Sequence, residues 1–165
     1  MKTLNVGVIG CGVWGRNHAR VYRQIPFTNL HTISDIDENR VKKIAQLNGS
    51  EYTTDVDKLI EDPEIELVSI CTPTVTHAEI ALKALEAGKH VLVEKPMTDT
   101  LAEAKSLIAM AEKKGLKLTV GFVERFNPAV DKALDLVKAD TIGDCLLYTS
   151  PSPRDLSTSR MPSSA

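Results

Sequence analysis

The chain has 165 residues, enough for one ordinary domain, with a formal net charge of −2 and 42% hydrophobic residues. This charge gives no electrostatic reason to expect nucleic acid or an anionic membrane as a partner. No signal-peptide pattern, no run near the roughly 20 apolar residues of a membrane span and no metal-ligand spacing among the three cysteines is visible, so a cytoplasmic protein without metal is expected.

Strand-like and helix-like segments alternate along the chain. Apolar, β-branched runs predict strands at residues 4–9, 30–36, 51–53, 66–71, 90–93 and 118–122. Helical patterns between and after them predict helices at 13–24, 38–48, just before Pro63, 76–88, 100–115 and 128–137. This alternation implies parallel pairing, and therefore an α/β fold with a doubly wound parallel sheet, the Rossmann fold.

Helix-capping residues support these boundaries. Two patterns with Ser or Thr followed three residues later by Glu, at 76–79 and 100–103, predict capping boxes. Asp37 and Asn127 are expected to cap the helices that follow them, and Gly49 is expected to end the helix that begins after Asp37.

A glycine-rich turn follows the first strand and opens the first helix. It has the G-x-G-x-x-G pattern of dinucleotide-binding proteins and reads Gly10-Cys11-Gly12-Val13-Trp14-Gly15. Asp35 ends the second strand about 20 residues later, where the fingerprint places an acidic residue that accepts bonds from the adenosine ribose. Its carboxylate would repel a 2′-phosphate, so NAD is favoured over NADP, although Asp35 could also be a simple turn aspartate.

Three further segments follow strands at the same predicted edge of the sheet. Ligands bind outside the carboxyl ends of the strands in open α/β sheets, so these segments are candidates for the cofactor pocket. Each has a structural alternative: packing or helix entry for the histidine, and loop or surface ion pairs for the charged residues. The candidate residues are Cys71, Thr72, Pro73, His77, Glu94, Lys95 and Arg125.

Taken together, the segments GCGVWG, SDID, CTPTVTHAEIALKALEAGKHVLVEKP and GFVERFNP resemble the Gfo/Idh/MocA oxidoreductase family over about residues 3–144. The resemblance implies a two-domain enzyme that forms homo-oligomers. It implies that Lys95 is the catalytic lysine, that Glu94 lies near the nicotinamide, and that the Lys95–Pro96 bond is cis. A lysine in this place could share the hydroxyl proton of a carbinol, and burial is expected to tune it for that role.

The resemblance predicts hydride transfer between the nicotinamide and a carbinol of a sugar, nucleotide-sugar or cyclitol. GFVERFNPAV is similar to the branch that contains UDP-N-acetylglucosamine 3-dehydrogenases. The family also supplies an aspartate and a histidine from its second domain, so this chain is expected to bind cofactor better than it turns over substrate. One alternative is a non-catalytic NAD-sensing regulator of the same fold, which the intact EKP argues against. Another is a different Rossmann reductase, such as a dihydrodipicolinate reductase relative.

The segment LLYTSPSPRDLSTSRMPSSA at the end of the chain has no apolar periodicity and is rich in serine and proline. It resembles a translated adapter sequence found at the ends of environmental gene fragments. We therefore expect a nucleotide-binding domain at 1–144 and a disordered, non-native tail at 145–165.

Overall fold

A computed structural model describes residues 3–141 of the chain, and the expected tail at 145–165 lies outside these described residues. The described part divides between Phe122 and Val123 into two compact units. The first unit contains alternating strands and helices: β1 (Leu4–Ile9), α1 (Val13–Gln24), β2 (Thr28–Ser34), α2 (Glu38–Asn48), β3 (Glu51–Thr53), α3 (Val56–Glu61), β4 (Leu67–Ile70), the 3-10 helix η1 (Thr74–Thr76), α4 (His77–Glu86), β5 (His90–Val93), α5 (Leu101–Lys114) and β6 (Leu118–Val120).

The six strands form one parallel sheet in the order β3-β2-β1-β4-β5-β6. The strand order reverses between β1 and β4, and this is the switch point at which doubly wound sheets bind ligands. The predicted Rossmann-type fold is therefore confirmed.

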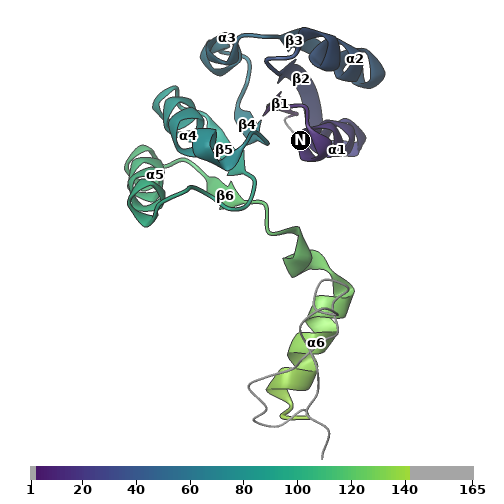
Figure 1. Cartoon of the computed structure of the whole chain (residues 1–165), viewed down its shortest axis with the longest axis vertical. Helices are drawn as coiled ribbons and strands as arrows, with labels where there is room; N and C mark the ends of the chain where they lie inside the picture. The colour runs from purple at the N-terminus through teal and green to yellow at the C-terminus, as the bar shows by residue number, and fades with distance from the viewer. Residues whose placement is uncertain (1–2, 142–165) are drawn as a thin grey trace, which may run out of the picture. The chain divides into compact units, whose positions relative to one another are not determined.

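Helices cover both faces of the sheet (Figure 1). On one face α1 and α2 bury a cluster that includes Val6, Val8 and Val41. On the other face α3, α4 and α5 bury a second cluster, which includes Ile70 and Leu107. The central strands are buried on both sides, which explains why they read as continuous apolar runs.

Some predicted boundaries shift by a few residues. The second strand begins at Thr28 and ends at Ser34 rather than spanning 30–36, and the sixth ends at Val120. The fourth strand is also shorter than 66–71, spanning Leu67–Ile70. The first residue beyond each of these strands still donates one backbone hydrogen bond to the neighbouring strand, namely Asp35, Cys71 and Gly121, but the regular pairing has ended. Apolar composition alone therefore overestimates the strands at that end.

Three of the four predicted side-chain caps are present. Asp37 accepts from Arg40 N at 3.0 Å, Asn127 accepts from Ala129 N at 3.0 Å, and the box at 100–103 closes in both directions. The predicted box at 76–79 is wrong. Thr76 is the last residue of η1 and has right-handed helical dihedral angles. Its hydroxyl lies 2.8 Å from Thr72 Oγ1 and from the Pro73 carbonyl instead.

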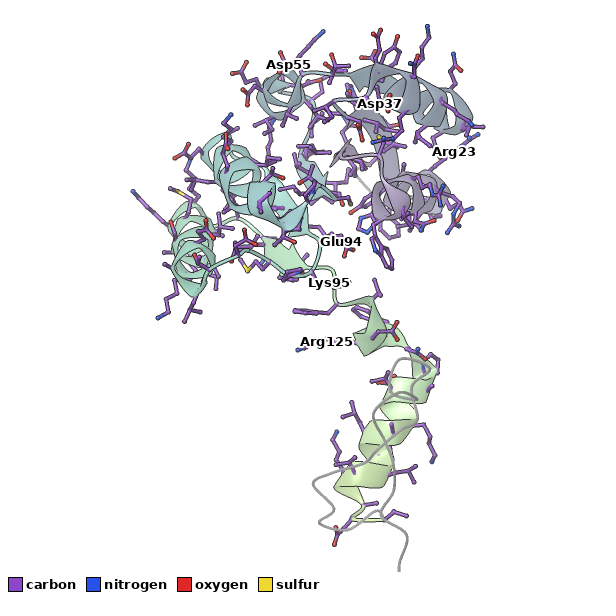
Figure 2. The ribbon with its side chains drawn as sticks, viewed as in Figure 1. Arg23, Asp37, Asp55, Glu94, Lys95 and Arg125 are labelled. Atoms are coloured by element: carbon purple, nitrogen blue, oxygen red, sulfur yellow. The ribbon has the colours of Figure 1, made fainter. Side chains whose placement is uncertain are left out.

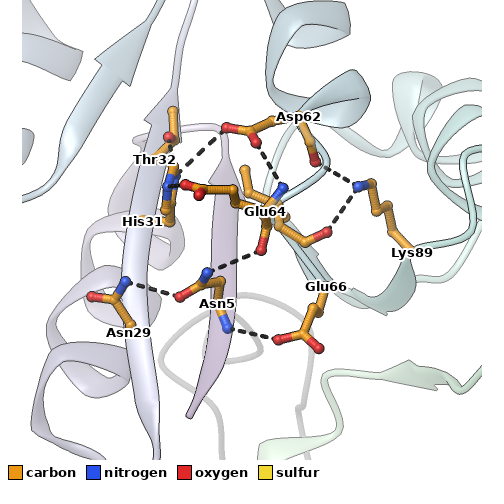
Figure 3. Close-up of polar contacts among 9 residues, drawn as sticks. Asn5, Asn29, His31, Thr32, Asp62, Glu64, Glu66 and Lys89 are labelled. Carbon is orange, nitrogen blue, oxygen red and sulfur yellow. Dashed lines mark hydrogen bonds and ion pairs between the residues drawn. The ribbon is translucent and has the colours of Figure 1, made fainter.

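The amino ends of the strands are joined by a polar network that has a structural role (Figure 3). Lys89 is only 6% exposed and donates to the carbonyls of Asp62 and Ile65 at 2.6 and 2.8 Å. Burial lowers the pKa of Lys89. His31 Nε2 lies 3.0 Å from Glu64 Oε2 at the same edge. These contacts fix the loop after α3 and give the amino edge a structural role, which leaves the opposite, carboxyl edge as the candidate ligand site.

The second unit contains the 3-10 helix η2 (Val123–Phe126) and α6 (Pro128–Lys138). Asn127 and Pro128 begin α6 as the sequence predicts. Among the residues described in the two units, no helix is long and apolar enough to cross a membrane.

Candidate cofactor site

The glycine turn after β1 is built by close packing at two of its glycines. Gly10 has a positive φ of 90°, and a Cβ on it would lie 2.8 Å from the Cys71 carbonyl carbon. A Cβ on Gly15 would lie 1.7 Å from the Gly10 carbonyl oxygen. Side chains at these two positions would therefore separate α1 from the ends of β1 and β4.

Gly12 differs from Gly10 and Gly15, the two other glycines of the motif. It is the N-cap residue of α1, and a Cβ added there would meet no protein atom within 4 Å. No side chain caps this helix start, and its first turn contains no acidic residue. The free N–H groups and the open space beside Gly12 fit the pyrophosphate of a dinucleotide, which would supply the missing acceptors.

Asp35 ties the glycine turn to the start of α2. Its side chain is nearly buried, with Oδ2 accepting from Cys11 N at 2.6 Å and Oδ1 from Asp37 N at 2.9 Å. Arg40, which the sequence analysis did not single out, lies 3.3 Å from Oδ1 and is half exposed. Asp35 thus stands beside the turn, as the fingerprint predicts, with its charge partly compensated by Arg40.

The loop after β4 is joined to the loop after β5 by His77. This histidine is 1% exposed, with Nε2 2.9 Å from the Thr72 carbonyl and Nδ1 2.9 Å from the Pro96 carbonyl. Both ring nitrogens thus face backbone oxygens of loops that lie at the carboxyl edge. These contacts give His77 a structural role between the loops, and its predicted place in the cofactor pocket, with that of Cys71, Thr72 and Pro73, stays a prediction.

Glu94 and Lys95 follow β5 and lie together at the end of this strand (Figure 2). The Lys95–Pro96 bond is cis, as the resemblance implies. Lys95 Nζ lies 5.9 Å from the centroid of the Trp14 ring, so the glycine turn and the candidate catalytic lysine converge. The expected burial of Lys95 is not seen, because its side chain is exposed in this structure. Val13 and Trp14 are also exposed at the turn.

A buried hydrogen-bonded chain leads from β4 to Glu94, and the sequence analysis did not find it. His18 on α1 contacts Ser69 Oγ through Nδ1 at 2.8 Å and Glu94 Oε1 through Nε2 at 3.1 Å. Glu94 Oε2 accepts from Lys95 N at 3.1 Å. In the sequence, only the position of His18, about one helical turn after the start of α1, could have indicated that it lies near the glycine turn.

The two described cysteines near the site are protected thiols. Burial, as the largest cause, raises the pKa of Cys11 and that of Cys71 to about 12. Thiolates are the reactive form, so neither residue is suited to nucleophilic catalysis at neutral pH. Within residues 3–141, no group of three or more His, Cys, Asp or Glu side chains could hold a metal ion.

Arg125 lies on η2, in the second unit. Its side chain is exposed. Its predicted place beside the cofactor therefore stays a prediction.

Residues 4–122 match a family described as "Oxidoreductase family, NAD-binding Rossmann fold". The myo-inositol 2-dehydrogenase of Thermotoga maritima is 36% identical over 85% of this chain and 42% of its own length. UDP-N-acetylglucosamine 3-dehydrogenase of Acidithiobacillus ferrooxidans is 39% identical over 79% of this chain and 40% of its own length. The crystal structure of GenD2 from gentamicin A biosynthesis, in complex with NAD, aligns with a TM-score of 0.82 at 32% identity and covers 86% of this chain and 40% of that protein. The chain thus spans about two fifths of the length of these relatives.

Proposed function

The chain belongs to the Gfo/Idh/MocA oxidoreductase family with its NAD-binding Rossmann fold, and we propose that it is the cofactor-binding part of a sugar or cyclitol dehydrogenase. The complete enzyme would transfer a hydride between the nicotinamide and a carbinol carbon of a sugar, nucleotide-sugar or cyclitol. Relatives named as inositol and UDP-N-acetylglucosamine dehydrogenases support this substrate class. The complete protein is proposed to form homo-oligomers.

The observation that carries the proposal is the approach of Lys95 to the glycine turn, with Nζ 5.9 Å from the Trp14 ring centroid. The turn would bind the pyrophosphate, so a lysine at this distance can reach a substrate that meets the nicotinamide end of the same cofactor. When bound, NAD supplies the hydride acceptor. Lys95 would then hydrogen-bond the reacting oxygen and, in its neutral amine form, take the hydroxyl proton as the carbinol is oxidised.

Asp35 supports NAD rather than NADP as the preferred cofactor. Its carboxylate is fixed by two backbone N–H groups, and the ribose hydroxyls would take the lone pairs that the half-exposed Arg40 contacts at 3.3 and 3.5 Å. A 2′-phosphate at the same place would meet this negative charge. Arg40 reduces the repulsion but is itself shared between Asp35 and Asp37, at 3.3 and 3.2 Å.

Titration of the chain with NADH and with NADPH tests this proposal, with the fluorescence of Trp14, the only tryptophan, as the readout. We expect a saturable response with NADH binding at least about tenfold more tightly than NADPH. Asp35→Ser should narrow the difference between the NADH and NADPH affinities. Asp55→Ser, which only replaces one capping side chain with another at the start of α3, should not. A folded chain that responds to neither dinucleotide would contradict the proposed function.

A further inference from the structure

Ser69, His18 and Glu94 form a chain of hydrogen bonds in which the partners determine the proton positions. A carboxylate only accepts hydrogen bonds, so His18 Nε2 donates to Glu94 Oε1 across 3.1 Å. With that proton on Nε2, Nδ1 can accept from the Ser69 hydroxyl at 2.8 Å. All three groups are satisfied by one tautomer, and Ser69 and Glu94 are 0% and 4% exposed.

The carboxylate of Glu94 is held on its other sides as well. Oε2 accepts from the Lys95 backbone N–H at 3.1 Å. Gly121 leaves the room that the carboxylate occupies, because a Cβ there would lie 2.6 Å from Oε1. Glu94 therefore has a fixed position and little contact with water, and a fixed charge in such surroundings acts more strongly on a neighbour than it would in solvent.

The order serine, histidine and carboxylate is also that of a hydrolase triad, but burial excludes this reading. Ser69 lies in the middle of β4 with 0% of its surface exposed, so no substrate carbonyl can reach its hydroxyl. The chain of hydrogen bonds ends at Glu94, next to the candidate catalytic lysine. We therefore expect the chain of hydrogen bonds to influence the site through the Glu94 carboxylate.

We propose that His18 is a positioning residue that fixes the Glu94 carboxylate, and that this fixed charge makes the site prefer NAD⁺ to NADH. The inference rests on the proposed function, which places the nicotinamide end of the cofactor at this edge of the sheet. The nicotinamide ring is cationic in NAD⁺ and neutral in NADH, so a fixed anion stabilises the oxidised form selectively. The neighbouring cation, Lys95, is exposed and therefore better screened by water than Glu94.

Three substitutions separate the charge of Glu94 from its position. Glu94→Gln removes the charge and keeps the shape. His18→Asn keeps an amide near the Nδ1 position, beside Ser69, but loses the donor to Glu94. His18→Gln places an amide donor near the Nε2 position and can keep Glu94 in place. His31→Asn is the matched control, because His31 pairs with Glu64 at 3.0 Å at the opposite, amino edge of the sheet (Figure 3).

The measurement is the ratio of the NAD⁺ and NADH dissociation constants, determined by calorimetry on one preparation of each 165-residue variant. Partial unfolding affects both constants equally and cancels in this ratio. We expect Glu94→Gln and His18→Asn to weaken NAD⁺ relative to NADH by about tenfold. His18→Gln should restore most of the preference that His18→Asn loses, and His31→Asn should keep the wild-type ratio.

The outcomes distinguish the inference from the proposed function. A wild-type chain that binds both forms, with a ratio that Glu94→Gln and His18→Asn leave unchanged, would overturn the inference alone. If His18→Asn and His18→Gln lost the preference for NAD⁺ over NADH to the same extent, the positioning role of His18 would be overturned. Binding of neither form by the folded wild-type chain would overturn the proposed function and the inference with it.

Discussion

At the scale of single residues, two glycines of the turn have different structural roles. Gly15 permits a close contact between backbones, because a Cβ on this residue would lie only 1.7 Å from the Gly10 carbonyl oxygen. Gly12 has open space at the same position. One glycine is therefore required by the fold, and the other is required only if a ligand approaches the turn.

Alanine substitutions at these two glycines test the difference. We expect Gly15→Ala to lower the free energy of unfolding by roughly 1–3 kcal/mol, because α1 has to move away from β1. Gly12→Ala should leave thermal stability close to wild type but weaken NADH binding, because the new methyl group fills the space proposed for the pyrophosphate. Thermal unfolding and Trp14 titration of both variants check this. Normal NADH binding by Gly12→Ala would argue against a pyrophosphate at this turn.

At the scale of elements, the Thr-x-x-Glu pattern forms a capping box only where the threonine before the helix has an extended backbone. Thr100 has φ −124° and ψ 152°, so its side chain faces the first turn of α5 and closes the box with Glu103. Thr76 carries the same Thr-x-x-Glu pattern, but its backbone is already helical because it is the last residue of η1. The two threonines thus share a motif and differ in function.

Threonine-to-alanine substitutions measure this difference. We expect Thr100→Ala to cost about 1 kcal/mol of the free energy of unfolding, the usual value of an N-cap. Thr76→Ala removes contacts with Thr72 and the Pro73 carbonyl but no cap, and it should cost less. Urea unfolding of both variants gives the two values. Equal costs would contradict the assignment of the cap to Thr100 alone.

At the scale of the whole molecule, the parallel sheet gathers the ends of β1, β2, β4 and β5 at one edge. The glycine turn, Asp35, Cys71 and Glu94 all follow directly from these ends. The same packing buries Cys11 and partly buries Cys71. The proposed cofactor site and the alkaline stability of the fold therefore depend on the same edge of the sheet.

The buried thiols predict a loss of stability in alkali. Their pKa rises from 9.0 to about 12 in the folded chain, so between these values the unfolded state has lost protons that the folded state keeps. The free energy of unfolding then falls as pH rises, by up to about 1.4 kcal/mol per pH unit for each thiol. Urea unfolding under reducing conditions at pH 7.5 and pH 10 measures the fall. It should be smaller in Cys11→Ala/Cys71→Ala, and an identical fall in this variant would show that other groups cause it.

The sequence by itself determined the fold class, the helix bounds of α1 and α2, the glycine turn and the acidic residue after β2. These features depend on local patterns, namely apolar periodicity, capping residues and glycine spacing, which short segments specify. The NAD-binding family also followed from the sequence, because its motifs stand at strand ends in the expected order.

Only the tertiary structure decided which distant side chains meet. The pairing of His18 with Ser69 and Glu94 joins residues 51 and 76 positions apart, and Arg40 reaches Asp35 from the first turn of the next helix. His77 and Lys89 also turned out to hold backbone carbonyls of other loops. Such contacts depend on the order of strands in the sheet and on the rotation of each helix against it, which bring together groups that no local pattern connects.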